Sequence, residues 1–485
     1  MRMSRPRLLP VTAPSAAVPL TARLMTALLM TAALMTAALL AGCSSGHAPG
    51  TAASSIPAAG SSSPPAAAAA TNWPVYHLNP ARTGLATGLP AAGKLSIAWT
   101  RKLDGAVYGQ PLAVGGTVIA ATENDSVYSL DRTTGRVRWR RHLGTPVPLS
   151  ALPCGNIDPL GITGTPGYDP ATKLVYAVAE ETGYRHVLYG ITLTGQVRID
   201  RLLPTPDDEP RYDQQRPSIT LAGGRVYAAF GGLYGDCGPY IGSVVSVPAS
   251  GTGPMTSYRV PASREGAIWG TGNLVAAPHG TLYTSVGNGA AVKAGGRYDG
   301  SDSVVELSPT LHRIAFFAPA TWADDNANDL DLGSMSPALL DNGTILADGK
   351  RGTAYLLDAG QLGGIGGQLA KAPVCRAFGG SAVDGAVAYL PCADGGLAAV
   401  STAGHQIRVL WRGPGAANGS PVLGGGAVWV ASTDSGILYE LSQATGRVRQ
   451  HIALGGALPH FASPSLSGGL VLTGTMTGVT AVNGA

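Results

Sequence analysis

Residues 115–139, GGTVIAATENDSVYSLDRTTGRVRW, constrain the fold more than any other part of the chain, because weaker copies of them recur. Two short runs of β-branched and aromatic residues, 118–122 and 126–130, lie on either side of an Asn-Asp turn. A second turn, Thr-Thr-Gly, leads into a third run that ends at Trp139. Such runs, separated by turn residues, predict three antiparallel strands.

Related blocks indicate a ring of repeated units. They occupy residues 173–199, 343–364 and 425–450, and this spacing with four strands per unit favours a β-propeller. Blades can be assigned to residues 107–144, 161–204, 214–261, 266–319, 332–373, 375–414, 415–454 and 457–484.

The last blade has only three predicted strands, and residues 94–103, KLSIAWTRKL, resemble a fourth strand with no blade before it. Pairing the two would close the ring and hide two exposed strand edges. We therefore expect an all-β fold: one eight-bladed β-propeller closed by an N-terminal strand. Seven blades is the alternative, if one weak segment is an insertion.

Composition and motifs exclude several functions. Only 13% of the 485 residues are charged and the net charge is +4, without a run of Lys and Arg, so no nucleic-acid partner is expected. No nucleotide-binding fingerprint, Walker loop, His-Glu-x-x-His or Gly-x-Ser-x-Gly motif is present. Histidines are few and scattered, which argues against a serine–histidine hydrolase.

The N-terminus is typical of an export signal. Four arginines precede or border an uncharged Leu-, Met- and Ala-rich run at residues 24–41, which ends in Leu-Ala-Gly-Cys. This ending resembles the bacterial lipobox, which implies a signal peptide over residues 1–42 and a lipidated Cys43. Alternatives are an ordinary signal peptide or a short transmembrane anchor.

Residues 43–71 are nearly all Ser, Ala, Pro and Gly after the cysteine, and this composition predicts a flexible tether. The propeller is then expected over residues 72–485. We expect an exported protein that its lipid holds at the outer face of the cell membrane.

Four cysteines remain after Cys43, and an even number in an exported chain suggests disulfides. Cys375 and Cys392 bracket a hairpin-like stretch and are expected to pair. Cys154 and Cys237 fall in neighbouring blades and would form the second bond. No Cys-x-x-Cys exists, which argues against structural zinc.

The repeat resembles that of quinoproteins, the blade of pyrroloquinoline quinone (PQQ) dehydrogenases and of related non-enzymatic propellers. Residues 72–85, NWPVYHLNPARTGL, resemble the opening segment of such chains. In that segment the Trp and Tyr pack against the propeller before the first strand. The resemblance therefore implies that Trp73 and Tyr76 are apolar anchors.

Three local matches imply calcium and quinone contacts. Residues 230–238, FGGLYGDCG, resemble the stretch whose carboxylate binds calcium, which points to Asp236. Ile268-Trp269-Gly270 resembles the segment whose Trp forms the floor under the quinone. Residues 285–289, SVGNG, resemble the stretch whose Asn binds calcium, which points to Asn288.

Two further matches imply a base and a cation. Residues 328–334, NDLDLGS, resemble the segment that carries the catalytic base; Asp331 is the best match, with Asp329 as the alternative register. Residues 348–358, DGKRGTAYLLD, resemble the segment that supplies a cation to the quinone oxygens. Lys350 takes that role, or Arg351 if the register slips.

The implied chemistry is consistent, although the pattern departs from the family. Calcium and Lys350 would polarise a quinone carbonyl while Asp331 takes a proton from an alcohol. However, the chain has no adjacent cysteine pair and no Cys-x-x-Cys-His haem motif, and Leu330 replaces the family's Trp. Each matched residue also has an ordinary structural interpretation, as a turn cap, a packing residue or a solvated hairpin tip.

Two functions follow from the sequence. The first is a monomeric, membrane-anchored binding or assembly scaffold, whose repeats resemble those of the propeller lipoprotein of outer-membrane barrel-assembly machineries. Its partner would be another envelope protein or a polymer, and it would need no cofactor. The alternative is a dehydrogenase that uses PQQ and calcium to oxidise an alcohol or aldose.

Overall fold

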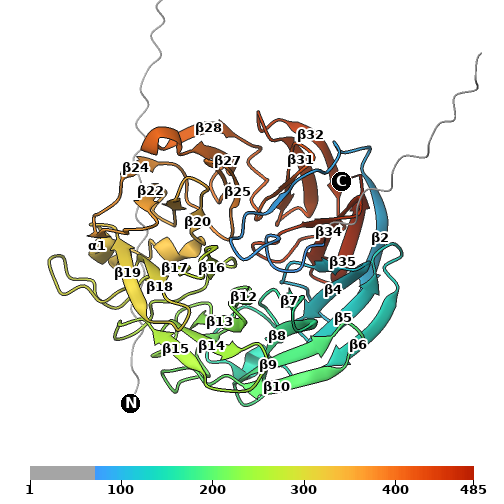
Figure 1. Cartoon of the computed structure of the whole chain (residues 1–485), viewed down its shortest axis with the longest axis horizontal. Coiled ribbons are helices and arrows are strands. Elements are labelled where there is room, and N and C mark those ends of the chain that lie inside the picture. The colour runs from blue at the N-terminus through green and yellow to red at the C-terminus, as the bar shows by residue number, and fades with distance from the viewer. Residues whose placement is uncertain (1–71, 485) are drawn as a thin grey trace, which may run out of the picture. The chain divides into compact units, whose positions relative to one another are not determined.

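The computed structural model describes residues 72–484, and these form a ring of eight β-sheets around a central channel (Figure 1). The expected eight blades are therefore present, and the seven-blade alternative is wrong. The predicted signal peptide, Cys43 and the tether lie outside the described residues.

In each blade four strands follow one another from channel to rim. The innermost strands are β3 (Leu112–Val114), β7 (Gly167–Asp169), β12 (Thr220–Ala222), β16 (Val275–Ala276), β20 (Ala338–Leu339), β25 (Ala382–Asp384), β29 (Val422–Gly424) and β33 (Ser465–Ser467). The second strands are β4 (Thr117–Thr122), β8 (Leu174–Glu181), β13 (Arg225–Gly232), β17 (Leu282–Val286), β21 (Thr344–Ala347), β26 (Val387–Cys392), β30 (Ala427–Ser432) and β34 (Leu470–Thr475).

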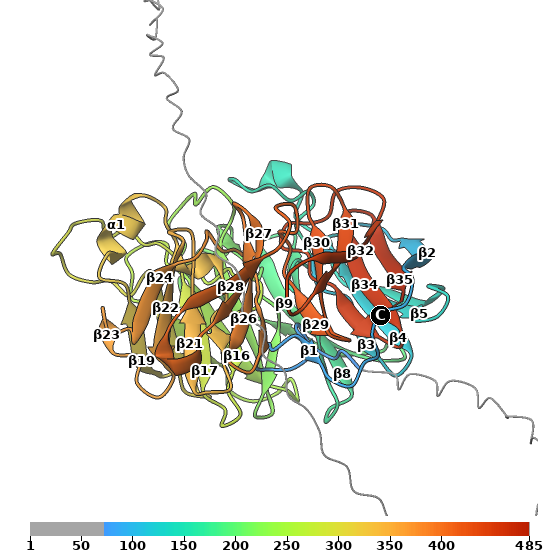
Figure 2. The same ribbon diagram turned by 90° about the horizontal axis from the view of Figure 1, so that it is seen from above.

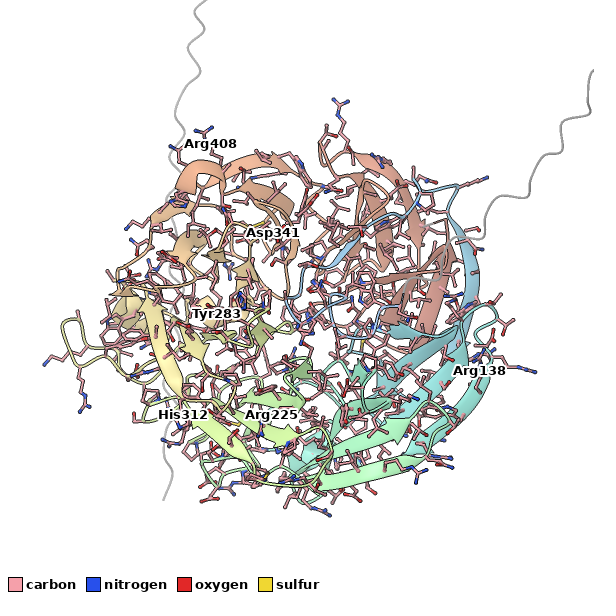
Figure 3. All side chains as sticks on the ribbon, viewed as in Figure 1. Arg138, Arg225, Tyr283, His312, Asp341 and Arg408 are labelled. Carbon is pink, nitrogen blue, oxygen red and sulfur yellow. A yellow bond between two sulfur atoms is a disulfide. The ribbon has the colours of Figure 1, made fainter. Side chains whose placement is uncertain are left out.

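The third strands are β5 (Ser126–Asp131), β9 (Arg185–Thr192), β14 (Ser243–Pro248), β18 (Ser303–Leu307), β22 (Thr353–Asp358), β27 (Gly396–Ser401), β31 (Ile437–Ser442) and β35 (Gly478–Asn483). The outermost strands are β6 (Val137–His142), β10 (Val197–Leu202), β15 (Thr256–Arg259), β19 (Arg313–Ala318), β24 (Ala370–Pro373), β28 (Arg408–Arg412), β32 (Val448–Ala453) and β2 (Ser96–Lys102). Exposed Arg138 on β6 and Arg408 on β28 point outward from the rim (Figure 3).

Three short strands extend individual blades, and helices are few. The added strands are β1 (Leu85–Ala86) on β29, β11 (Asp213–Gln214) on β13 and β23 (Gly364–Ile365) on β19. The helices are α1 (Trp322–Ala327) and the 3₁₀ turns η1 (Leu149–Ala151), η2 (Leu332–Ser334) and η3 (Ala403–His405). None of the helices between residues 72 and 484 has the length and apolarity needed to span a membrane.

The ring closes through the N-terminal strand. β2 pairs antiparallel with β35 from Ser96–Asn483 to Lys102–Gly478, so the last blade takes its outermost strand from the start of the ring. Closure removes the free edge that β35 would otherwise present to other chains.

Burial on both faces of each sheet explains why the blades need one another. Every residue of β4 and of β8 is buried, whereas nearly every residue of β6 is exposed. Apolar side chains of adjacent blades form shared clusters between the sheets. A single blade would leave this apolar surface in water, so the blades stabilise one another.

Tryptophans on the outermost strands connect neighbouring blades. The Trp99 ring on β2 lies against Gly135 in the β5–β6 turn, and its indole N–H donates to the carbonyl of Arg132 at 2.8 Å. Trp139 makes the same contact with Gly195 in the next blade. Gly135 has φ +64°, which suits glycine, and a Cβ there would lie 2.5 Å from the Trp99 ring. Gly135 and Trp139 of the opening repeat thus take part in two successive copies of the same inter-blade contact, Gly135 with Trp99 and Trp139 with Gly195.

Residues 73–86, called the plug below, cross one end of the channel (Figure 1). Carbonyl groups of the plug accept N–H groups from the inner strands of five blades, and side chains reach two more; the inner-strand donors are Ala113, Tyr168, Ala276, Val383 and Leu423. These amides point into the channel and would be unsatisfied in a dry interior. The plug therefore does more than the predicted anchoring by Trp73 and Tyr76.

Polar groups of the plug are also satisfied internally. His77 is fully buried, with Nδ1 at 2.9 Å from the Ser381 carbonyl and Nε2 at 2.9 Å from the Ser463 hydroxyl. A carbonyl only accepts, so Nδ1 donates. Burial lowers the pKa of His77 to about 3, so the imidazole is neutral at pH 7 and Nε2 accepts from the Ser463 hydroxyl. Arg82 donates to the carbonyls of Tyr76 and Ile219.

Both predicted disulfides are present. Cys154 and Cys237 join the linker between the first two blades to the β13–β14 loop of the third. Cys375 and Cys392 join the start of the sixth blade to the end of its second strand β26.

We predict that Gly135→Ala lowers the free energy of unfolding by about 2–4 kcal/mol, because the new methyl group meets Trp99 in an unfavourable backbone conformation. Gly115→Ala is the matched control, since Gly115 has φ +54° and a Cβ added there would meet no other atom within 4 Å. The control should cost only about 1 kcal/mol. Denaturant titration measures both, and equal losses would contradict the Trp99 contact.

A second prediction concerns acid stability. Burial lowers the pKa of His77 from 6.5 to about 3. Because the folded pKa is depressed, the stabilisation by neutral His77 is complete above pH 6.5 and declines as the pH falls towards 3. The stability difference between the wild type and His77→Asn should therefore shrink by up to about 1.4 kcal/mol per pH unit below that value. A difference that stays constant from about pH 8 to pH 5 would refute this assignment.

Candidate functional site

A cavity of about 400 Å³ lies at one mouth of the channel, and we call it the cup. All five residues predicted from the sequence line it: Asp236, Trp269, Asn288, Asp331 and Lys350. The alternative base Asp329 lines it as well, whereas Arg351 is not among its lining residues. Cavities of this size are typical of small-molecule sites.

Two kinds of loop bring these residues together. Asp236, Asn288 and Lys350 lie between the second and third strands of three consecutive blades. Trp269 and Asp331 lie in linkers that precede the inner strands β16 and β20. In a propeller these loops share one face, so side chains far apart in sequence converge.

The plug lies across the end of the channel opposite the cup-forming loops. The plug forms hydrogen bonds with the inner strands, which follow the cup-forming linkers along the chain. In Figure 2, β1 at the end of the plug lies near one face of the ring and α1 lies near the opposite face. Tyr76 lies between the two layers, with its hydroxyl 3.2 Å from the Thr271 hydroxyl in the linker that carries Trp269. The plug therefore lies beneath the linkers that form the cup and is tied to one of them.

An ion-paired group forms one wall of the cup. The Lys350 ammonium lies 2.6 Å from a carboxylate oxygen of Asp331 and 2.6 Å from one of Asp329. Burial opposes the charge on Lys350, but the two carboxylates raise its pKa above the ordinary value. Burial raises the pKa of Asp331, and Lys350 partly offsets this. The Lys350 ammonium is therefore charged at neutral pH, and the two carboxylates beside it balance this charge.

The second oxygen of Asp331 accepts the backbone N–H of Asn288. Gly287 permits this approach, because a Cβ at that position would lie 2.4 Å from the carboxylate oxygen. Asp331 is only 3% exposed, so both of its oxygens are engaged by protein. Each Asp331 oxygen thus already accepts one contact from protein, and these two contacts fix the orientation of the carboxylate.

Aromatic rings form the floor of the cup. The Trp269 ring lies 6.4 Å from the Phe378 ring and 6.0 Å from the Phe461 ring, and the two phenyl rings are nearly parallel. Lys350 lies 5.7 Å above the Trp269 ring. Such a floor suits a flat apolar ligand surface.

The metal side of the implied site is incomplete. Asp236 is exposed, and one of its oxygens accepts the Tyr240 hydroxyl at 2.6 Å. Within residues 72–484 no three His, Cys, Asp or Glu side chains are grouped so as to hold a metal ion. Calcium takes six to eight oxygen ligands, so Asp236 and Asn288 alone do not make its site. The aromatic floor suits a flat ring, whereas Asp236 and Asn288 supply only two of the oxygen ligands that calcium takes.

Among the cup residues that sequence reasoning missed, Arg216, Phe378 and Phe461 share one position in the repeat. Each lies four residues before an inner strand, β12, β25 or β33 respectively. This shared register within the repeat is a signal that could have found them, because equivalent linker positions face the same end of the channel.

Comparison with known proteins agrees with the repeat. Residues 90–286 match a family model described as "Outer membrane protein assembly factor BamB". No curated protein matches the sequence.

Solved structures share the fold at low sequence identity. Quinohemoprotein alcohol dehydrogenase from Comamonas testosteroni is 14% identical, with a TM-score of 0.66 over 85% of this chain and 80% of that one. A europium-containing methanol dehydrogenase is 14% identical, with a TM-score of 0.65 over 86% and 98%. BamB from Moraxella catarrhalis is 14% identical, with a TM-score of 0.56 over 81% and 100%.

The repeat, the eight blades and these matches agree that the chain folds as a PQQ-like β-propeller, whose residues 90–286 are similar to the matching family model.

Proposed function

We propose that the protein is a binding scaffold of the cell envelope, exported and held at the outer face of the membrane by lipidated Cys43. The cup is its receptor site, and the partner is another envelope protein or a polymer. The observation that carries this proposal is the state of the cup, where Lys350 and Asp331 neutralise each other at 2.6 Å. A scaffold needs a shaped cavity, whereas a dehydrogenase needs a base and a cation that are free to act.

The family comparison supports a binding role in general terms. The matching model and one similar structure carry the name of an assembly factor, and the signal-like N-terminus and lipobox-like Cys43 fit an envelope location. The scaffold is expected to act as a monomer.

A PQQ- and calcium-dependent dehydrogenase is the second candidate. The convergence of Asp236, Trp269, Asn288, Asp331 and Lys350 in one cavity favours it. The engaged Asp331 oxygens oppose it, as does the lack of a metal-binding cluster among residues 72–484.

We predict that Cys43→Ser moves the protein out of the membrane fraction and abolishes its labelling by radioactive palmitate, because serine offers no thiol for the lipid. Ser44→Ala is the matched control and should remain membrane-bound. Equal membrane association of Cys43→Ser and the wild type, without acyl label in either, would contradict the lipoprotein assignment.

We also predict that residues 72–485 show no calcium-dependent binding of PQQ and reduce no dye with alcohols or aldoses. Tryptophan fluorescence in millimolar calcium, compared with the same titration in chelator, measures the binding. Calcium-dependent binding that Trp269→Ala and Asn288→Ala both abolish, together with turnover, would replace the scaffold with the dehydrogenase.

A further inference from the structure

Arg216 differs in its hydrogen bonding from the other buried or half-buried arginines of the ring. Within residues 72–484, every other buried or half-buried arginine donates a hydrogen bond to protein; these are Arg82, Arg101, Arg132, Arg201, Arg225 and Arg351. Arg216 is half-buried, and among the described residues its guanidinium has no hydrogen-bond or ion-pair partner. A guanidinium carries five N–H donors, so this side chain reaches the cup with its bonding capacity unused.

The position of Arg216 separates it from the acids of the cup. Its guanidinium lies 5.7 Å over the Phe461 ring, at the edge of the aromatic floor. Burial lowers its pKa, while Tyr108 and Glu123 raise it, and none of the cup's aspartates contributes. The side chain still remains a cation at neutral pH. The cup thus has an unpaired Arg216 on one side and a neutralised Lys350 group on the other.

Glu123 does not neutralise this cation. It lies beyond ion-pair distance, and its carboxylate accepts the Gly161 N–H at 2.9 Å and the Thr163 hydroxyl at 3.2 Å. Burial raises the pKa of Glu123 to about 7, so a large fraction is protonated at neutral pH.

We infer that Arg216 anchors the carboxylate of a ligand whose flat apolar group rests on the floor made by Trp269, Phe378 and Phe461. A planar guanidinium binds a carboxylate through two parallel N–H bonds, and adjacent aromatic rings take the apolar remainder. This inference rests on the proposed role of the cup as a receptor site, and it names the class of ligand.

Two sources supply this chemistry: a free aromatic acid, or the terminal carboxylate of an envelope protein that ends in an aromatic residue. A chain terminus fits this chemistry because it carries a free backbone carboxylate, which an internal segment lacks. Both sources are tested with the same protein. The probes are 2-naphthoate with 2-naphthamide, and a short peptide ending in Phe as the free acid or the C-terminal amide.

Isothermal titration calorimetry of residues 72–485, at pH 7 with chelator present, measures binding of each probe. At least one acid should bind, and its amide should bind about 10- to 100-fold more weakly, because it lacks the charge that pairs with Arg216. Arg216→Gln should weaken binding of the acid by the same factor and leave the affinity for the amide unchanged. Arg216→Lys keeps the positive charge but loses the two parallel N–H donors of the guanidinium, so its affinity for the acid should be intermediate.

Arg211→Gln is the matched control, because Arg211 is exposed, stacks on Tyr212 and does not line the cup. It should bind the acids like the wild type. Equal affinity for acid and amide, no binding of either acid, or undiminished acid binding by Arg216→Gln would each overturn the inference. The Cys43→Ser fractionation does not depend on these probes, so failure of the acids alone removes the ligand class and leaves the anchored scaffold.

Discussion

Closure of the ring by β2 on β35 is the interaction on which the rest of the structure depends. Each blade is apolar on both faces, so no blade is stable unless another covers each side. Eight such sheets satisfy one another only as a closed circle, and the chain must therefore return to its beginning. The contact of Trp99 on β2 with Gly135 then connects the last blade to the first.

Using an N-terminal strand for closure has a consequence for the channel. The residues just before β2 are tied to the ring, and residues 73–86 lie across the ends of the inner strands. The inner strands gain partners for amides that would otherwise point into a dry space. The plug thus occupies this end of the channel, and the cup lies at the end formed by the loops.

The charges of the cup are distributed unevenly along its wall. The groups that a quinone enzyme would use are engaged with protein: Lys350 with two carboxylates, and Asp331 with Lys350 and the Asn288 amide. Arg216, on another part of the wall, has no such partner among the described residues. The five residues predicted from the sequence thus meet in one cavity in which the charges of Lys350 and Asp331 balance each other, and Arg216 lies outside that ion pair.

The sequence by itself determined the blades, the closing strand and both disulfides, because repeats and turn residues are local signals that fix topology. The five candidate site residues came from a resemblance to quinoproteins, and their meeting in one cavity was decided by the tertiary structure. It did not reveal the plug: His77 bonds Ser463, 386 positions away, and no local pattern encodes that contact. It did not reveal the ion pairs of Lys350 or the unpaired state of Arg216 either. Which polar groups neutralise one another depends on distances of a few ångströms between separate blades, and only the tertiary structure decided those.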